Sequence, residues 1–154
     1  MSIYPDNKQW KDIPGTKATD HFPFHCRKFL ASRHYPAHRH DFLELTFIVA
    51  GEGYQIVDNK KYIIRPGTFM FFLPYQVQEM VTESKEPLTL YNCMFDLQFV
   101  LSSLGPNLGL EQFLVLDEER TPSIQLTREE HGRVEDLFEK LTDEYSNEQK
   151  NTPA

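Results

Sequence analysis

His38-Arg39-His40-Asp41-Phe42-Leu43-Glu44, followed after six further residues by Gly51, is the stretch from which we interpret the rest of the chain. In an extended strand successive side chains point to opposite faces, so His38, His40 and Glu44 would share one face. Two imidazoles and a carboxylate are a ligand set that Zn, Mn, Fe or Ni accepts, with positions left open for water or substrate. The same groups also hydrogen-bond well to a polar organic ligand. The residues therefore predict a site and leave its occupant open.

Length, composition and charge predict one domain with a sizeable core. A chain of 154 residues buries about two-thirds of its unfolded surface. Its 16 Lys and Arg against 23 Asp and Glu give a net charge of −7, which argues against direct contact with DNA. Cys26 and Cys93 form no C-x-x-C pattern and no signal-peptide run precedes them, so we expect a cytoplasmic protein. The longest apolar run, 69–73, is too short to span a membrane.

Short runs of β-forming residues alternate with turn residues from Phe22 onward and predict a β-sandwich or barrel. Asp58-Asn59 is a plausible hairpin tip because Asn tolerates positive φ. The run 69–73 is apolar at every position, which predicts a strand buried on both faces. A short helix and a loop are expected within 97–112. The predicted strands are 24–32, 43–49, 54–57, 62–64, 69–73, 77–81, 88–95 and 113–116.

The last part of the chain predicts an amphipathic helix. Thr127 and Glu130 have the spacing of a capping box, so a helix should start there. Apolar residues then recur at helical spacing and form one stripe. This stripe packs either on the domain's own surface or on a partner helix, from a second copy or from a segment after Ala154. The stripe consists of Val134, Leu137, Phe138, Leu141 and Tyr145.

The spacing from His38 to Gly51 resembles the first cupin motif, and Pro66-Gly67 before an apolar run resembles the start of the second. The layout over residues 22–147 resembles the N-terminal sensor domain of AraC-type transcription regulators. The resemblance implies a cupin-type β-barrel, that is, a double-stranded β-helix or jelly roll, with a C-terminal amphipathic α-helix for dimerisation. It also implies that DNA is bound by a C-terminal domain absent from this sequence. We divide the chain into an arm (1–21), a barrel (22–120) and a dimerisation-type helix (121–150).

The second cupin motif departs from the family pattern at one ligand position. Counting from Gly67, Gln78 stands where the motif has a histidine. A glutamine oxygen is neutral and a weak partner for Zn or Fe(II) beside imidazoles. We therefore expect no cofactor, with one divalent transition metal on His38, His40, Glu44 and Gln78 as the alternative. A glutamine amide suits sugar hydroxyls, and so does Asn92.

Two interpretations follow from these residues. In the first, the chain is not an enzyme but the ligand-sensing and dimerisation domain of a regulator, which binds a small polar metabolite, a carbohydrate, inside the barrel. Tyr54 or Tyr91 would stack on the sugar. In the alternative, the chain is a metal-dependent cupin enzyme, an isomerase or oxygenase, which uses His38, His40 and Glu44. A plainer possibility is an interaction domain with an empty barrel, for which the dimer helix is the only function. His38 and His40 would then only hydrogen-bond within the barrel mouth. The ligand-binding residues of the first interpretation are His38, His40, Glu44, Gln78 and Asn92.

Overall fold

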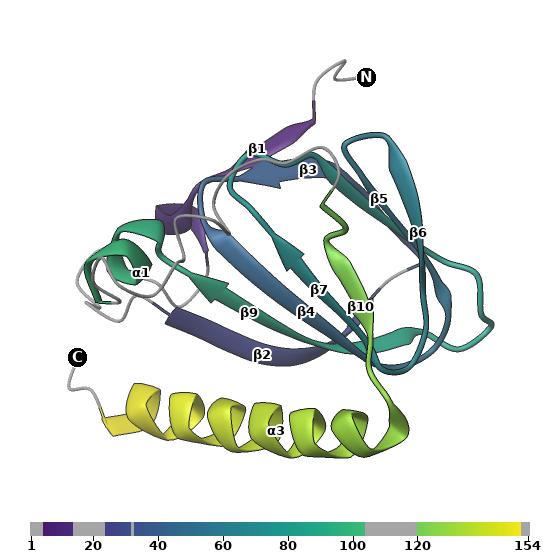
Figure 1. Cartoon of the computed structure of the whole chain (residues 1–154). Helices are drawn as coiled ribbons and strands as arrows, with labels where there is room; N and C mark the ends of the chain where they lie inside the picture. Colours follow the sequence, from purple (N-terminus) through teal and green to yellow (C-terminus); the bar gives the residue numbers. More distant parts are fainter. Residues whose placement is uncertain (1–4, 14–23, 32, 104–119, 152–154) are drawn as a thin grey trace.

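Two five-stranded β-sheets form the body of the molecule, and one long helix lies along the second sheet (Figure 1). The computed structural model describes residues 5–13, 24–31, 33–103 and 120–151. Within these residues the strand order is β1-β3-β8-β5-β6 in the first sheet and β10-β7-β4-β9-β2 in the second. The mostly β fold with a C-terminal helix confirms the prediction. The elements are β1 (Asp6–Lys8), η1 (Trp10–Asp12), β2 (Phe24–Ala31), β3 (His34–His40), β4 (Leu43–Ala50), β5 (Gly53–Val57), β6 (Lys60–Ile64), β7 (Thr68–Phe72), β8 (Gln78–Thr82), β9 (Leu88–Phe95), α1 (Leu97–Ser103), β10 (Ser123–Gln125) and α3 (Arg128–Asn151).

The hydrophobic core lies between the sheets and follows the alternation of side chains along the strands. On β7, Met70 and Phe72 are almost completely buried, whereas Phe69 and Phe71 on the opposite face are half-buried. The prediction for run 69–73 is therefore right for the inner face and only partly right for the outer face. The inner cluster consists of Ala31, Ile48, Val57, Ile64, Met70, Phe72, Met80, Leu88 and Leu90.

Two turns show why particular residues stand between the strands. Asp58 and Asn59 have φ angles of 48° and 67° and connect β5 to β6, which confirms the predicted hairpin tip. Gly51, the last position of the motif, has a φ of 86°. A Cβ atom at this glycine would lie 3.0 Å from the Cα atom of Leu88. Both the backbone conformation and the close approach of β9 therefore favour glycine here.

The predicted runs within the described residues match seven strands closely, and β1, β3 and β10 are additions. Strand β3 was not among the predicted strands, because Pro36 and three histidines weaken its β-forming pattern. The predicted short helix is present as α1. The predicted strand 113–116 lies outside the described residues. The second sheet continues past residue 120, because β10 pairs with β7.

Part of the predicted N-terminal arm belongs to the first sheet. Strand β1 pairs with β3 in parallel, and Lys8 lies opposite His40. The backbone N–H of Trp10 then donates to Oδ1 of Asp41 over 2.7 Å, and the indole contacts the ring of Phe42 edge-on at a centroid distance of 5.7 Å. The described part of the arm is therefore held against the first sheet at its edge.

Helix α3 begins with the predicted capping box. The Glu130 backbone N–H donates to Oγ1 of Thr127 over 3.3 Å, and the Thr127 N–H donates to the Glu130 carboxylate over 2.8 Å. The helix packs on the outer face of the second sheet (Figure 1), where Phe138 stacks on Phe47 and Tyr91 at centroid distances of 5.7 and 5.3 Å. The capping box thus fixes where the helix starts along this sheet.

The predicted dimerisation stripe is used mostly within the chain. Phe138 and Tyr145 are buried, and Val134 and Leu141 pack against the outer cluster of the second sheet. Leu137, by contrast, is 63% exposed. Packing on the domain's own surface is therefore the structural role of four of the five residues.

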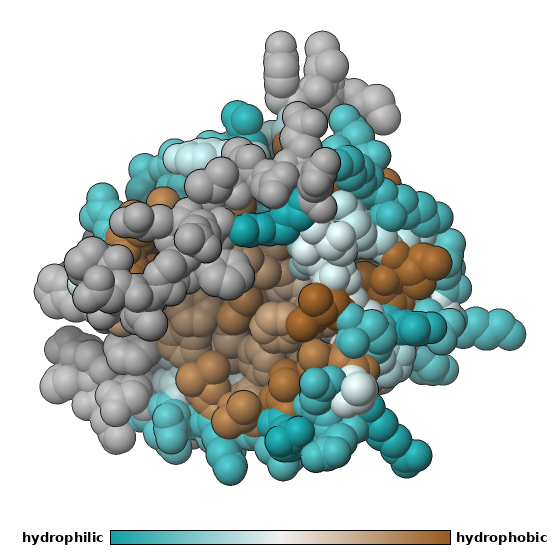
Figure 2. Space-filling model, viewed as in Figure 1, coloured by the Kyte–Doolittle hydropathy of each residue, from teal (hydrophilic) through white to brown (hydrophobic). Residues whose placement is uncertain are grey.

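The surface beside α3 retains hydrophobic area. Figure 2 shows this area above the helix, over the outer face of the second sheet. It includes half-buried side chains of Leu45, Phe69 and Phe95 and the exposed Ile124. Among the described residues, no helix is long and apolar enough to cross a membrane.

His25 is a buried histidine between β2 and α3. Its ring lies 5.2 Å from the ring of Tyr145, and its Nδ1 atom has no hydrogen-bond partner among the residues that the structure describes. Burial, with the nearby positive charge of Arg27, lowers the pKa of His25 from 6.5 to about 4. The folded chain therefore holds this imidazole neutral under conditions in which the unfolded chain protonates it.

This difference predicts a loss of stability in mild acid. Between about pH 6.5 and pH 4 the unfolded state binds a proton at His25 that the folded state does not, so the free energy of unfolding falls as the pH falls. We expect a loss on the order of 3 kcal/mol across this window from His25 alone. Urea titrations of the wild type and His25→Phe at a series of pH values test this. An unchanged pH dependence in the variant would contradict the assignment.

Candidate ligand-binding site

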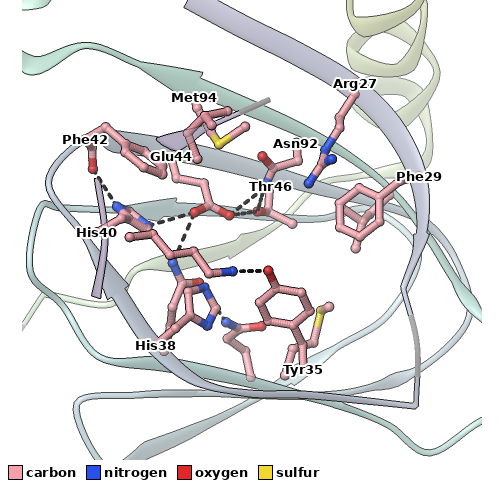
Figure 3. Close-up of a pocket in the computed structure, with 16 residues that line it drawn as sticks. Arg27, Phe29, Tyr35, His38, His40, Phe42, Glu44, Thr46, Asn92 and Met94 are labelled. Atoms are coloured by element: carbon pink, nitrogen blue, oxygen red, sulfur yellow. Dashed lines mark hydrogen bonds and ion pairs between the residues drawn. The ribbon is translucent and has the colours of Figure 1, made fainter. Parts of the chain in front are cut away.

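A cavity of about 80 Å³ opens into the interior between the two sheets. Strands of both sheets line it, namely β1, β3, β5 and β8 of the first and β2, β4 and β9 of the second. Figure 3 shows the polar side chains that point toward one another there. The volume is enough for several ordered waters or a small metabolite.

The side chains of the sequence motif reach the cavity from two strands rather than one. His38 and His40 lie on β3 in the first sheet, whereas Glu44 lies on β4 in the second. The chain crosses between the sheets at Asp41-Phe42, and the Tyr75 N–H donates to the His40 carbonyl over 2.7 Å at the end of β3. All three side chains line the cavity. The three side chains therefore face the same space, as predicted. They do so because the chain crosses between the sheets, and not because they lie on one extended strand.

His40 is the most enclosed polar residue of the site, with 1% of its surface exposed. Its Nδ1 atom lies 2.8 Å from the carbonyl oxygen of Phe42, so Nδ1 carries a proton and donates it. Its Nε2 atom lies 2.7 Å from Oε2 of Glu44. The ring also stacks on Phe42 at a centroid distance of 4.0 Å. These contacts fix the orientation of the imidazole.

Glu44 is the centre of a buried hydrogen-bond network (Figure 3). Besides His40, it accepts hydrogen bonds from the side chains of Asn92, Gln78 and Thr46, the last two over 3.2 and 3.3 Å. Burial raises the pKa of Glu44, but the hydrogen bond and positive charge of His40 outweigh this effect, and the pKa lies below its usual value. Glu44 is therefore a carboxylate in the folded protein.

Gln78 takes the place of the missing motif histidine and joins the same network. Its Nε2 atom lies 2.7 Å from His40 Nε2, and its Oε1 atom accepts a hydrogen bond from Gln55 over 3.0 Å. Gln78 thus links His40 to Gln55 across the first sheet. Counting from Gly67 places this residue correctly, although sequence alone gives no sign of Gln55.

His38 lies beside the network rather than in it. Its Nδ1–H donates to the Pro36 carbonyl over 2.9 Å, which leaves Nε2 as the ring nitrogen for a ligand. Its ring centroid is 6.3 Å from that of His40. Burial lowers the pKa of His38 more than the Pro36 carbonyl and Glu44 raise it, so the imidazole is neutral at neutral pH.

Three of the four predicted metal ligands, His40, Glu44 and Gln78, contact one another in this structure. In the described part of the chain, no three His, Cys, Asp or Glu side chains converge in a way that could hold a metal ion. His40 Nε2 faces both Glu44 and Gln78, and Gln78 is neutral. This donor set does not fit a transition metal as it stands. The metal remains an alternative prediction.

Several cavity residues lie outside the sequence prediction. Lys8, Arg27, Phe29 and Tyr35 line the cavity, and they come from edge strands or from the unpredicted β3. Thr46 shares the inner face of β4 with Glu44, and strand alternation identifies it once Glu44 is placed inside. The pairing of β2 with β9, which brings Arg27 beside Asn92, leaves no local signal in the sequence.

The predicted stacking residues are corrected by the structure. Tyr91 lies on the outer face of β9 and stacks on Phe138 under the helix, so it does not reach the cavity. Tyr54 is not among the residues that line the cavity, and its ring contacts Lys61. The aromatic rings that do line it are those of Phe29, Tyr35 and Phe42.

Comparison of the sequence with known families gives one match. A model of the family described as AraC-like ligand binding domain matches residues 18–153. This range contains both sheets except β1, and the whole of α3. A search of curated proteins found no match.

Solved structures share the fold at low sequence identity. ToxT from Vibrio cholerae is 13% identical with a TM-score of 0.55, and the alignment covers 81% of this chain and 54% of ToxT. A second ToxT structure, bound to (E)-4-(8-methylnaphthalen-1-yl)but-3-enoic acid, is 11% identical with a TM-score of 0.56 and coverages of 77% and 48%. A cupin 2 conserved barrel domain protein from Salinispora arenicola is 17% identical, with a TM-score of 0.46 and coverages of 55% and 72%. The chain spans 64% of the length of a cupin protein from Bacteroides fragilis, and it likewise spans only part of the two ToxT chains. The two ToxT structures, with TM-scores above 0.5, share the fold of this chain, and the predicted fold class is confirmed.

Two His–Glu contacts of equal length allow a test of the buried network. His40–Glu44 and His34–Glu79 are both 2.7 Å long, but only the first is buried. We expect Glu44→Gln to lower the free energy of unfolding by about 3 to 5 kcal/mol, because it leaves a buried network without its acceptor charge. Glu79→Gln should cost less than about 1 kcal/mol. Urea denaturation at pH 7 measures both, and equal losses would contradict the assigned role of Glu44.

Proposed function

Because the chain belongs to the family of AraC-like ligand-binding domains, we propose that it senses a small polar metabolite, a carbohydrate, in the cavity between its sheets. The observation that carries this proposal is the buried polar network around Glu44, which lines the cavity instead of being sealed inside the core. A purely structural domain would fill such a space with apolar side chains.

The hydrogen bonds still available in the cavity suit hydroxyl groups. Asn92 and Gln55 use their amide nitrogens on Glu44 and Gln78, which leaves their carbonyl oxygens as acceptors. His38 offers Nε2, and the Thr46 hydroxyl, whose proton goes to Glu44, offers its oxygen as an acceptor. A hydroxyl can donate to one group and accept from another. Several hydroxyls on one small ring would therefore satisfy these groups together.

The aromatic rings add a surface for the carbon face of a sugar. Phe29 and Tyr35 line the cavity together with the polar groups. Small-molecule sites commonly combine an apolar wall with a few oriented polar groups. ToxT, part of which shares this fold, has been solved bound to an organic acid, which supports a small-molecule ligand for this chain.

In a transcription regulator, such a ligand would act by favouring one arrangement of the N-terminal arm or of the dimer. DNA contact is proposed for another part of the regulator, since this chain carries a net charge of −7. Homodimerisation and a cytoplasmic location also remain proposals. Of the predicted stripe, Leu137 is the residue whose exposure leaves it accessible to a second copy.

Ligand binding to the folded state can be tested by thermal stability. We expect one member of a panel of neutral monosaccharides and their derivatives to raise the melting temperature in a concentration-dependent way. At a ligand concentration of 100 times Kd, the free energy of unfolding should rise by about 2.7 kcal/mol. His38→Asn keeps a donor for the Pro36 carbonyl but lacks Nε2, so it should weaken this ligand. His38→Gln is the matched variant that retains a polar group at the position of Nε2. No response to any compound would contradict the proposal.

Metal content separates the proposed sensor from the alternative enzyme. For protein purified without chelator or nickel, we expect transition metal far below one per chain by plasma mass spectrometry. Gln78→His, which restores the motif histidine, should increase the zinc content because imidazole is a better ligand than a glutamine oxygen. Stoichiometric metal in the wild type would revive isomerase or oxygenase chemistry on His38, His40 and Glu44.

A further inference from the structure

Two cationic side chains line the cavity, one from each sheet. Lys8 comes from β1, at the edge of the first sheet, and Arg27 comes from β2, at the edge of the second. Arg27 lies opposite Asn92 in the strand register and on the same side of the sheet, toward Thr46 and Phe29 (Figure 3). Lys8 lies opposite His40 in the register of β1 and β3. Both cations therefore border the same cavity as the polar network.

Both cations rest on neutral aromatic groups. The Lys8 ammonium donates a hydrogen bond to the Tyr35 hydroxyl and lies 4.3 Å from the centroid of that ring. The Arg27 guanidinium lies 4.9 Å from the centroid of Phe29. Within the described parts of the chain, neither forms an ion pair with Asp or Glu. Their charges are thus held in place but not neutralised.

The carboxylate that lines the cavity already has hydrogen-bond partners within the protein. Glu44 is the one carboxylate among the described cavity-lining residues, and it is bonded to His40, Gln78, Asn92 and Thr46. The cavity therefore carries an excess of positive charge in a chain whose net charge is −7. In a partly desolvated space such an excess attracts an anion more strongly than it would in water.

We propose that the ligand is an acidic sugar, whose carboxylate or phosphate pairs with Lys8 and Arg27 while its hydroxyls bind the network around Glu44. This inference rests on the proposed sensing function and narrows it to one charge class. A uronate and a sugar phosphate share the required chemistry, which is a compact anion on a hydroxylated ring. Arg27 is suited to either group because its guanidinium can donate two parallel hydrogen bonds.

The test compares sugars that differ only in the acid group. Glucose, glucuronate and glucose 6-phosphate form one set, and galactose and mannose give the corresponding sets. Thermal shift and calorimetry on the whole chain measure each compound at fixed ionic strength. We expect an acidic member of one set to bind at least about tenfold more tightly than its neutral sugar. Preference for the uronate or the phosphate identifies the anion.

Charge-removing variants locate the anion site. Lys8→Gln and Arg27→Gln should each weaken the acidic ligand by about 10- to 100-fold and leave the neutral sugar unchanged. Lys11→Gln and Lys28→Gln are matched controls. Lys11 follows β1 in η1 and is exposed, and Lys28 lies next to Arg27 on the opposite face of β2 over Tyr91. The controls should bind both compounds like the wild type, and Arg27→Lys should retain most of the preference for the acid.

The possible results separate this inference from the proposed function. A neutral sugar that binds as tightly as its acids would overturn the anion site and leave sugar sensing intact. The anion site would also be overturned if Arg27→Gln weakened the binding of neutral and acidic sugars equally. Arg27 would then bind the hydroxyls of the sugar and not its acid group. If no member of any set stabilises the chain, both the inference and sugar sensing are contradicted.

Discussion

The contact between His40 and Glu44 is the interaction on which the site depends, because it joins the two sheets inside the molecule. His40 ends β3 in one sheet, and Glu44 lies at the start of β4 in the other. Their side chains meet at 2.7 Å where the chain crosses between the sheets. An isolated buried carboxylate would be costly, so the surrounding donors are part of the same solution. Asn92 and Gln78 then bring β9 and β8 into the network.

The network leaves part of its hydrogen-bonding capacity facing open space. Buried polar groups that are fully satisfied by one another make a rigid core and need no ligand. Here the amide nitrogens of Asn92 and Gln55 are used, whereas their carbonyl oxygens and Nε2 of His38 are available to a guest. The same contacts that hold the two sheets together therefore also orient a binding surface. This dual use explains why replacing His40 is a poor test of ligand binding, since its loss would disturb both.

The sequence predicts the motif residues of the site well, but it misses the residues that the edge strands bring to the cavity. The spacing of His38, His40 and Glu44 identifies three residues that do line the cavity, and counting from Gly67 identifies Gln78. Alternation along 88–95 places Asn92 and Tyr91 on opposite faces of β9, so only one of them can face the cavity. The period alone does not say which face is inside, because α3 buries the outer face as well. Arg27 and Phe29 reach the cavity through the pairing of β2 with β9, whose partners are 57 positions apart at Ala31 and Leu88 and 71 at Phe24 and Phe95.

The position of Lys8 connects the cavity to the N-terminal part of the chain. Strand β1 is an edge strand that pairs only with β3 within the described residues, and Trp10 and Lys8 add contacts with Asp41, Phe42 and Tyr35. A strand paired on one side only has a smaller free energy of local opening than the central strands. A ligand that contacts Lys8 binds better when β1 is docked than when it is not. By linkage, the ligand then stabilises the docked arm by that difference in affinity, and the arm strengthens the ligand by the same factor.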